Sequence, residues 1–380
     1  MTIKFECLCF LCGLVLLLAG CSRPLENLNR VSSPGETVFF VPNAKKMVAL
    51  TFDDGPNGVF TARILDALHE SRAPASFFVL GSNAERYPDL IKRIAAEGHL
   101  IGNHTFRHSR FDQVTKAEME KDIADGSIAI EALTGMKPRW FRPPYGINGE
   151  GLEEACRRQG LVIAGWSLDA NDWNPHPVEE LVEAIVSQVT PGDIILLHDG
   201  WETRPDADRH LTAAAVPVII DKLRQAGFVL VTLPELQRNT GVPLAVFENG
   251  IRLLGLQIPG KPLSPGGEFG ARYFWDVPDN LPGTLPSAFV HFRKIRSKYF
   301  FQDDHDLNRR GDVRDLVVRR AVVVPSNAPA GKFEIMTGLF PPDAPETKDR
   351  LKVRSDFPQA QRAVYLPQAL EILPLSGKPD

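Results

Sequence analysis

An alternation of apolar, strand-like runs with helical stretches between Met47 and about Arg238 is the feature that most limits the folds open to this chain. After a first run that starts at Met47, the runs occupy residues 75–80, 99–102, 162–166, 193–197 and 228–231. A helix predicted over residues 115–133 opens with Thr115 and Glu118, a capping box that satisfies free backbone donors. Such alternation produces parallel strands covered by helices, in a (β/α) barrel or a doubly wound sheet. The length favours one barrel-like α/β domain over residues 44–240.

After residue 241 the helical periodicity disappears and short alternating segments follow, separated by turns rich in Gly, Pro and Asp. These segments are residues 251–258, 272–277, 287–293, 317–324, 332–339 and 362–366. Strands at this spacing predict a smaller all-β domain, an antiparallel sandwich over residues 245–380. We expect Phe274 and Trp275 to be exposed, and the sandwich to bind glycan or a partner protein; a simple spacer is the alternative.

The first twenty residues predict an export signal, because Lys4 precedes an apolar stretch at residues 8–18 that is shorter than the ~20 residues of a membrane span. Residues 18–21 resemble the lipobox of bacterial lipoproteins, which predicts cleavage before Cys21 and a lipid on that cysteine; an ordinary cleaved signal is the alternative. Polar, proline-punctuated residues 21–43 are expected to be a tether. The predicted location is the bacterial cell envelope, lipid-anchored at a membrane, periplasm-facing or extracellular, with Ser22 suggesting the outer membrane.

The cysteine count argues against a disulfide-stabilised protein, and the net charge gives no support for a nucleic-acid-binding protein. Three of the five cysteines leave with the signal and Cys21 would carry lipid, so only Cys156 remains and no disulfide framework can form. Cys156 is expected to be a small core residue. The net charge is -4, so no basic excess argues for nucleic acid as a partner.

Two adjacent acids, Asp53 and Asp54, end the first apolar run, and Gly55-Pro56 stops the strand behind them. The carboxyl ends of parallel strands are where ligands and catalytic groups collect in α/β folds. The pair is therefore either a solvated turn or two catalytic acids with different roles.

A histidine pair, His104 and His108, follows the strand-like run at residues 99–102. Spaced four apart, the two imidazoles lie on one face of a helix or helical turn and can reach one ion. A carboxylate from another strand end, Asp53 or Asp54, would complete a two-His, one-carboxylate site. The pair alone could also be a coincidence.

Three further clusters follow apolar runs: Arg142-Pro143-Pro144-Tyr145-Gly146, residues 166–173 and residues 196–199. Each has a structural interpretation, as a stiff proline loop, core aromatics and a hydrogen-bonded strand-end histidine. All five clusters nevertheless fall at the carboxyl ends of separate strands, so they would converge on one rim.

The segments TFDDGP, HTFRH, RPPYG, LDANDW and LLHD, in this order, resemble the five motifs of the NodB-like polysaccharide deacetylases, carbohydrate esterase family 4. The match runs from about residue 48 to 236, and it implies a distorted (β/α) barrel. The C-terminal half weakly resembles immunoglobulin-like sandwiches appended to bacterial envelope proteins.

The resemblance implies that Asp54, His104 and His108 ligate a divalent metal and that Asp53 is the general base, held by Arg142. The ligand set suits zinc, with cobalt, nickel or manganese as alternatives. Asp54 and Asp53 can have these different roles because a carboxylate bound to an ion takes up a proton less readily than a neighbouring carboxylate that is not bound to it.

The resemblance also makes His198 the general acid that protonates the leaving amine, with its ring held by Asp172 or by Asp169. The backbone N–H of Tyr145 would stabilise the oxyanion. The expected substrate-binding side chains are Leu196, which with Trp173 lines the pocket for the acetyl methyl group, and Tyr145, Trp173 and Trp201, which stack on sugar rings.

These residues together predict a metal-dependent N-deacetylase of an N-acetylated envelope or extracellular polysaccharide, with N-acetylglucosamine the expected sugar. O-deacetylation of a polymer such as acetylxylan is the alternative within the same chemistry. A non-catalytic glycan-binding lipoprotein is the alternative from another class.

Overall fold

The computed structural model describes residues 32–374 apart from residues 42–44, 175–176, 203, 205, 241–242, 259–261, 279–280, 282–283, 308–314, 342–349, 356–358 and 361. The predicted signal at residues 1–20, the predicted lipidation site Cys21 and the first part of the predicted tether lie outside the described residues. Within the described part of the chain, none of the helices has the length and apolar character needed to cross a membrane.

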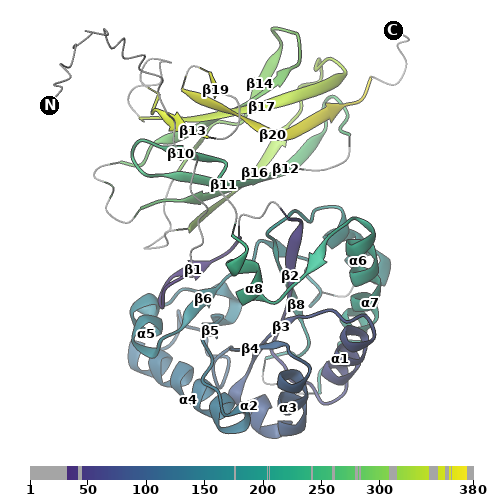
Figure 1. Ribbon diagram of the computed structural model, residues 1–380, viewed down its shortest axis with the longest axis vertical. Coiled ribbons are helices and arrows are strands. Elements are labelled where there is room, and N and C mark those ends of the chain that lie inside the picture. Colours follow the sequence, from purple (N-terminus) through teal and green to yellow (C-terminus); the bar gives the residue numbers. More distant parts are fainter. Residues whose placement is uncertain are drawn as a thin grey trace, which may run out of the picture.

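The chain folds into an α/β domain and a smaller all-β domain, which confirms the predicted fold class (Figure 1). The strands of the first domain are β1 (Thr37–Val38), β2 (Met47–Asp53), β3 (Ser76–Val79), β4 (Leu100–Asn103), β5 (Trp140–Phe141), β6 (Val162–Ala164), β7 (Leu168–Asp169), β8 (Ile194–His198) and β9 (Val229–Leu230). They form one sheet in the order β1-β6-β5-β4-β3-β2-β8-β7, with β9 paired to β2. All of these pairings are parallel.

The sheet curls into a distorted barrel whose two ends are joined by the chain itself. Strand β7 is at one end of the strand order and β6 is next to the other end, where only β1 lies outside it, yet only residues 165–167 separate β6 and β7 in sequence. We call these three residues, together with Ala164 at the end of β6, the seam. Because β6 and β7 do not pair, the backbone carbonyls at the seam need hydrogen-bond donors from elsewhere.

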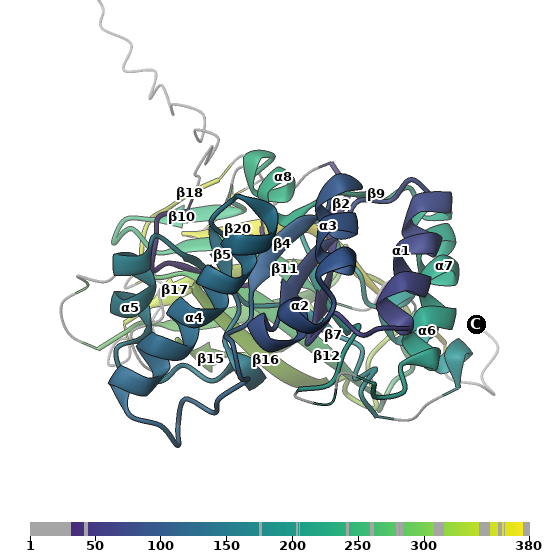
Figure 2. The ribbon, with the colours of Figure 1, turned by 90° about the horizontal axis from the view of Figure 1, so that it is seen from below.

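Helices surround the outside of the curled sheet (Figure 2). They are α1 (Phe60–Glu70), α2 (Gly81–Arg86), α3 (Pro88–Ala96), α4 (Lys116–Thr134), α5 (Leu152–Gln159), α6 (Val178–Val186), α7 (His210–Gln225) and α8 (Leu233–Arg238), with a short 3₁₀ turn at Pro144–Gly146. Helix α4 begins with the predicted capping box between Thr115 and Glu118. Cys156 in α5 is buried, and burial raises the pKa of its thiol, as expected for a core residue.

The last residues of the predicted tether belong to the fold. Thr37 and Val38 form β1, which pairs with β6, and Val38, Phe40 and Val41 are buried. The polar, proline-punctuated composition of residues 21–43 concealed this short apolar run, which gains its strand partner only from the distant residues of β6.

The all-β domain is a sandwich of two antiparallel sheets, as predicted. One sheet has the order β16-β12-β11-β10-β18, and the other has the order β14-β13-β17-β20-β19 with β15 paired to β13. The strands are β10 (Ala245–Phe247), β11 (Arg252–Gln257), β12 (Glu268–Asp276), β13 (Ser287–Lys294), β14 (Phe300–Gln302), β15 (His305–Asp306), β16 (Asp315–Val323), β17 (Gly331–Phe340), β18 (Val353–Arg354), β19 (Gln359–Ala360) and β20 (Ala363–Ile372).

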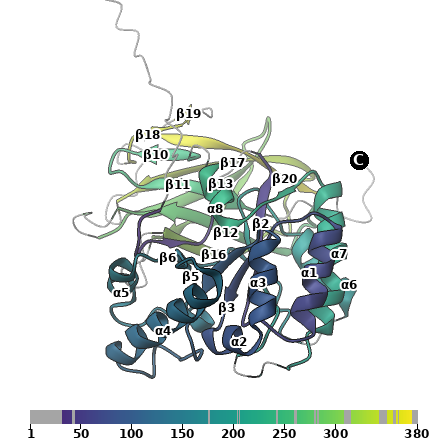
Figure 3. The same cartoon turned by 60° about the horizontal axis from the view of Figure 1, so that its bottom comes forward.

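The expectation that Phe274 and Trp275 are exposed is wrong. Trp275 is fully buried in the core between the two sheets, and Phe274 is 2% exposed. Phe274 lies on the outer face of β12, where it stacks on Phe40 of the first domain with ring centroids 4.1 Å apart and packs against Leu254. Figure 3 shows the β12–β16 sheet facing the barrel. The outer face of this sheet is therefore an interdomain surface.

Candidate active site

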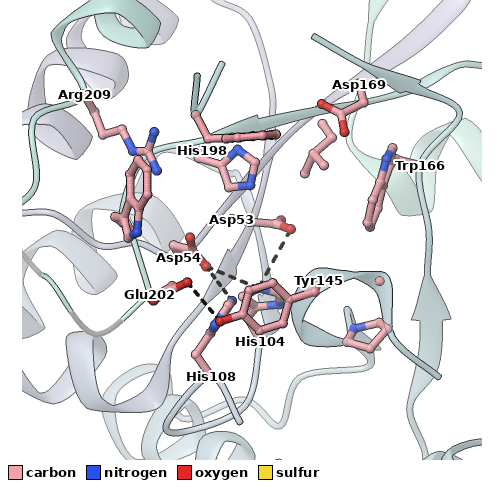
Figure 4. A pocket seen from close by; sticks show the side chains of 15 residues that line it. Asp53, Asp54, His104, His108, Tyr145, Trp166, Asp169, His198, Glu202 and Arg209 are labelled. Carbon is pink, nitrogen blue, oxygen red and sulfur yellow. Dashed lines mark hydrogen bonds and ion pairs between the residues drawn. The ribbon is translucent and has the colours of Figure 1, made fainter. Parts of the chain in front are cut away.

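The carboxyl ends of five strands bring the five motif clusters to one cavity of about 360 Å³ (Figure 4). The register places Asp53 of β2 beside His198 of β8, and Asn103 of β4 beside Phe141 of β5. The predicted site residues that line the cavity are Asp53, Asp54, His104, His108, Tyr145, Trp173, Leu196 and His198.

Asp54, His104 and His108 converge within this cavity. Asp54 Oδ1 lies 3.3 Å from His104 Nε2 and 3.1 Å from His108 Nε2, and all three groups are buried. Asp54 Oδ1 has no hydrogen-bond partner in the described part of the chain. Ligands bonded to a tetrahedral ion at about 2.0–2.2 Å lie roughly 3.3–3.6 Å from one another, so one separation is at the lower edge of that range and the other is slightly shorter, and a small outward movement of His108 would admit a divalent metal.

The tautomer and charge of these groups also suit a metal. His104 Nδ1 lies 2.7 Å from the carbonyl oxygen of Arg142 and can donate its proton there, which leaves Nε2 free to ligate. Burial by itself raises the pKa of Asp54, but the imidazoles of His104 and His108 outweigh this and hold that pKa well below its usual value. The three ligand atoms fall within 4.8 Å of one another.

The histidine segment is a loop and not the helical turn that the spacing predicted. Thr105 and His108 have left-handed backbone, with φ of 71° and 61°. Side chains fix this shape: Asn103 Oδ1 accepts from Thr105 N at 2.7 Å, and Thr105 Oγ1 accepts from His108 N at 2.8 Å. Asp122 of α4 accepts further loop N–H groups, including that of Arg107 at 2.9 Å. Hydrogen bonds replace helical periodicity in bringing both imidazoles to Asp54.

Asp53 is held by Arg142, the arginine of the third motif. Arg142 Nη1 donates to Asp53 Oδ1 at 2.7 Å and to Thr51 Oγ1 at 2.8 Å. The guanidinium is fully buried and also donates to the seam, from Nη2 to the carbonyl of Gly165 at 2.9 Å and from Nε to that of Ala164 at 3.3 Å. Arg142 thus orients Asp53 and satisfies the backbone where the barrel is not closed by strand pairing.

His198 is paired with Asp172 and not with Asp169. Asp172 Oδ1 lies 2.7 Å from His198 Nδ1, while Oδ2 accepts from His198 N at 2.8 Å and from Thr212 Oγ1 at 2.7 Å. Burial lowers the pKa of His198, but Asp172 more than reverses this and the pKa rises to about 9. Asp169 instead accepts from Asn171 N, and burial raises its pKa. His198 therefore carries a proton near neutral pH.

The cavity mouth is formed by aromatic side chains. Tyr145 and Trp173 are 44% and 48% exposed, so their faces are open to a ligand. The Tyr145 ring packs edge-on against His108 with centroids 4.6 Å apart, and its hydroxyl donates to Glu202 at 2.9 Å (Figure 4). Burial raises the pKa of Tyr145 to about 12, so the hydroxyl keeps its proton. Leu196 lines the same cavity as a buried apolar group.

Sequence reasoning missed several groups around this cavity. Asp199 is fully buried and accepts from Thr61 Oγ1 at 2.5 Å, and burial raises its pKa to about 7. A Cβ at Gly55 would lie 2.1 Å from Asp199 Oδ2, which explains why glycine follows the acid pair. The position of Asp199 directly after His198 was the only available signal.

Arg209, the residue immediately before α7, is a second group that the sequence did not indicate. It is buried, lines the cavity, and donates from Nε to the carbonyl of Gly200 at 2.5 Å. Its guanidinium lies 4.5 Å from the ring of Trp201. Nothing in the local sequence distinguishes Arg209 from the other arginines, because its contacts depend on the loop after β8.

Comparison with known proteins agrees with this geometry. A family model described as polysaccharide deacetylase matches residues 41–164. The chain is 37% identical over 206 residues to a peptidoglycan-N-acetylglucosamine deacetylase of Bacillus cereus, covering 54% of this chain and 94% of the relative. It is 39% identical over 194 residues to a chitooligosaccharide deacetylase of Sinorhizobium fredii, covering 50% of this chain and 90% of the relative.

Among solved structures, a peptidoglycan N-acetylglucosamine deacetylase in complex with a naphthalenyl N-oxidanyl-benzamide matches with a TM-score of 0.50 and 36% identity. That match covers 53% of this chain and 92% of the other. The chain therefore belongs to the polysaccharide deacetylase family and is a hydrolase of that type.

Proposed function

We propose that this chain removes acetyl groups from N-acetylglucosamine units of an envelope or extracellular polysaccharide in a reaction that depends on a divalent metal. The observation that carries the proposal is the cavity itself, in which Asp53 held by Arg142 and His198 held by Asp172 flank the Asp54 cluster. Relatives named as deacetylases of peptidoglycan and of chitooligosaccharides support the choice of sugar.

The metal would be held by Asp54, His104 and His108, and zinc suits two imidazoles and one carboxylate. When bound, such an ion acts as a Lewis acid that polarises the amide carbonyl and makes water a stronger nucleophile. The buried Asp54 oxygen without a hydrogen-bond partner supports a cation at this position.

Asp53 would act as the general base. Arg142 fixes one of its oxygens, so the other, Oδ2, is free to take a proton from the attacking water. Oδ2 lies 4.0 Å from His104 Nε2, which places the base beside the ligand cluster.

His198 would act as the general acid and donate its Nε2 proton to the leaving amine. Asp172 accepts from Nδ1 and raises the pKa of His198, so the imidazolium form persists at neutral pH. The backbone N–H of Tyr145 would stabilise the oxyanion.

Substrate binding would use the apolar and aromatic lining of the cavity. Leu196 and Trp173 would receive the acetyl methyl group, and the exposed faces of Tyr145 and Trp173 would stack on sugar rings. We further propose that the chain is anchored in the cell envelope by a lipid on Cys21, on the strength of the lipobox-like residues 18–21.

The test compares Asp53→Asn with His104→Ala in the purified chain. We expect Asp53→Asn to lose acetate release from chitin oligomers by at least about 100-fold while metal content stays near that of the wild type, because general base catalysis contributes about 10²–10⁴-fold. His104→Ala should lose both acetate release and metal. Full activity in Asp53→Asn would refute the assigned role.

Substrate class is tested by measuring acetate release from peptidoglycan, chitin oligomers, poly-N-acetylglucosamine and acetylxylan under the same conditions. The proposal requires activity on at least one of the N-acetylated polymers. Release from acetylxylan alone would replace N-deacetylation by O-deacetylation, and release from none would favour a glycan-binding protein.

A further inference from the structure

A second cavity, of about 520 Å³, lies between the two domains. Its barrel side is formed by the seam residue Ser167, by β7 and by the residues that follow α6, and its sandwich side by the outer faces of β12 and β16. We call it the interdomain crevice. Gly270 of β12 lies within it, and a Cβ at that position would meet nothing within 4 Å, so the crevice is open there.

Two arginines from neighbouring strands face this crevice. The antiparallel register places Arg272 of β12 directly opposite Arg319 of β16. Like charges directly opposite on one sheet face repel each other and destabilise the pairing. Burial and the neighbouring Arg319 lower the pKa of Arg272, and the attraction of Asp193 offsets this only in part.

Arg272 has a hydrogen-bond donor left over. Its Nη2 is buried and has no partner within the part of the chain that the structure describes. A buried, unused guanidinium N–H is costly, and it is satisfied best by an oxygen of a carboxylate or phosphate. The third arginine of the crevice, Arg320, is already bound to Asp303 at 2.9 Å.

The crevice adjoins the catalytic cavity. Asp169, at the carboxyl end of the edge strand β7, lines both of them. The acids near the two arginines are Asp169, which attracts Arg319, Asp193, which attracts Arg272, and the exposed Glu268. These attractions still leave Arg272 Nη2 without a hydrogen-bond acceptor in the described part of the chain.

We propose that the interdomain crevice binds a carboxylate group of the glycan strand whose N-acetyl group occupies the catalytic cavity, with Arg272 and Arg319 as its ligands. The inference rests on the proposed deacetylase function and names its substrate more closely, as an acidic polysaccharide. It also gives the sandwich a role, since both arginines come from that domain. Arginine suits this task because its planar fork binds carboxylates through two parallel hydrogen bonds.

The test uses the full chain and a matched pair of substrates. One is a tetrasaccharide of alternating N-acetylglucosamine and N-acetylmuramic acid with free carboxylates, and the other is the same tetrasaccharide with those carboxylates amidated. Acetate release gives kcat/KM for the wild type and for the double variant R272Q/R319Q. Arg296→Gln is the control, because Arg296 is exposed in a turn of the sandwich and is not among the crevice residues.

We expect the wild type to prefer the acidic form by about tenfold or more, the size of one charge-assisted hydrogen bond. In the double variant, kcat/KM should fall for the acidic tetrasaccharide and stay unchanged for the amidated one, so the preference disappears. Arg296→Gln should keep the preference of the wild type. Equal activity of the wild type on both forms, or an equal loss on both forms in the double variant, would overturn the proposal.

Calorimetric titration separates this inference from the proposed function. If the wild type releases no acetate from either form, the deacetylase proposal fails, but tighter binding of the acidic form by the wild type than by the double variant would still support the crevice site. Inorganic phosphate serves as a second ligand. Binding of phosphate without discrimination between the two tetrasaccharides would mean that the crevice takes a free anion, and the inference would be wrong.

Discussion

Replacing Asp172 by Asn tests how the cavity keeps its proposed acid protonated. Asp172 makes three contacts at once, with Nδ1 and N of His198 and with the hydroxyl of Thr212, and it is buried. Asparagine has nearly the same shape but no charge. The substitution therefore removes the main influence that raises the pKa of His198, while the amide oxygen can still accept from His198 Nδ1 and hold the ring; the amide NH2 then replaces the oxygen that accepts from His198 N and Thr212.

The size of the effect follows from the pKa. His198 has a pKa of about 9 against an ordinary value of 6.5, so the environment favours the imidazolium by roughly 3 kcal/mol. If the pKa returns to about 6.5, the protonated fraction at pH 7.5 falls from about 97% to about 9%. We expect kcat at pH 7.5 to fall about tenfold from this cause, whereas at pH 5.5 the fraction stays near 90% and the loss nearly disappears.

The assay is a pH profile of kcat for acetate release by the wild type, Asp172→Asn and the control Asp169→Asn. The alkaline limb should lie near pH 9 in the wild type and about 2 units lower in Asp172→Asn. Asp169→Asn removes an acid from the same cavity that does not bind His198, so its alkaline limb should stay close to that of the wild type. A loss in Asp172→Asn that is the same at every pH would refute the electrostatic argument.

Two further predictions concern buried charges around the acid pair. Arg142→Lys keeps a positive charge near Asp53 but loses the fork that reaches the carbonyls of Ala164 and Gly165, so urea unfolding should show a loss of about 2–4 kcal/mol, because two buried carbonyls lose their donors, together with lower kcat; unchanged stability would contradict the role of Arg142 at the seam. Asp199 has a folded-state pKa of about 7, above that of the unfolded chain, so its contribution to stability declines as pH rises from about 4 to 7. With a chelator present, thermal unfolding should therefore show that Asp199→Asn is more stable than the wild type, by a margin about 2 kcal/mol larger at pH 8 than at pH 5. An equal difference in stability at both pH values would show that the buried carboxyl is not the cause.

Much of the α/β domain could be predicted from the sequence, because its elements are set by local apolar runs and breaks. The Gly55-Pro56 stop and the capping box at Thr115 are local signals of this kind, and the structure has a strand end and a helix start at those positions. The convergence of the clusters followed from the geometry of parallel strands, since each motif lies at a strand's carboxyl end.

Other features depend on contacts that are distant in sequence. The loop at His104 and His108 takes its shape from hydrogen bonds to its own Asn103 and Thr105 and to Asp122, a residue of α4, and the last of these contacts is not visible in the local sequence. The sequence left open whether Asp169 or Asp172 pairs with His198, because the two acids are close in sequence at the end of the same strand. The turn at residues 170–172 directs the carboxylate of Asp172 toward His198, while that of Asp169 accepts from Asn171 N.

The burial of Phe274 shows the same limit at the level of domains. Alternation along β12 separates its two faces, and Trp275 occupies the inner one. It does not reveal that the outer face is covered by another domain, since Phe40 lies more than 230 residues earlier in the chain. An exposed aromatic platform and an interdomain contact have the same local sequence pattern.

The position of Arg142 also bears on how such a chain can change over time. One guanidinium serves the base, through Asp53, and the barrel, through the two seam carbonyls. A lineage that abandons hydrolysis but keeps the fold could replace His104 or His108 at a smaller cost, whereas the loss of Arg142 would leave buried carbonyls without donors and the buried Asp53 without its ion-pair partner. This arginine should therefore outlast the catalytic activity it serves, and its presence alone is a poor guide to whether a chain of this fold is active.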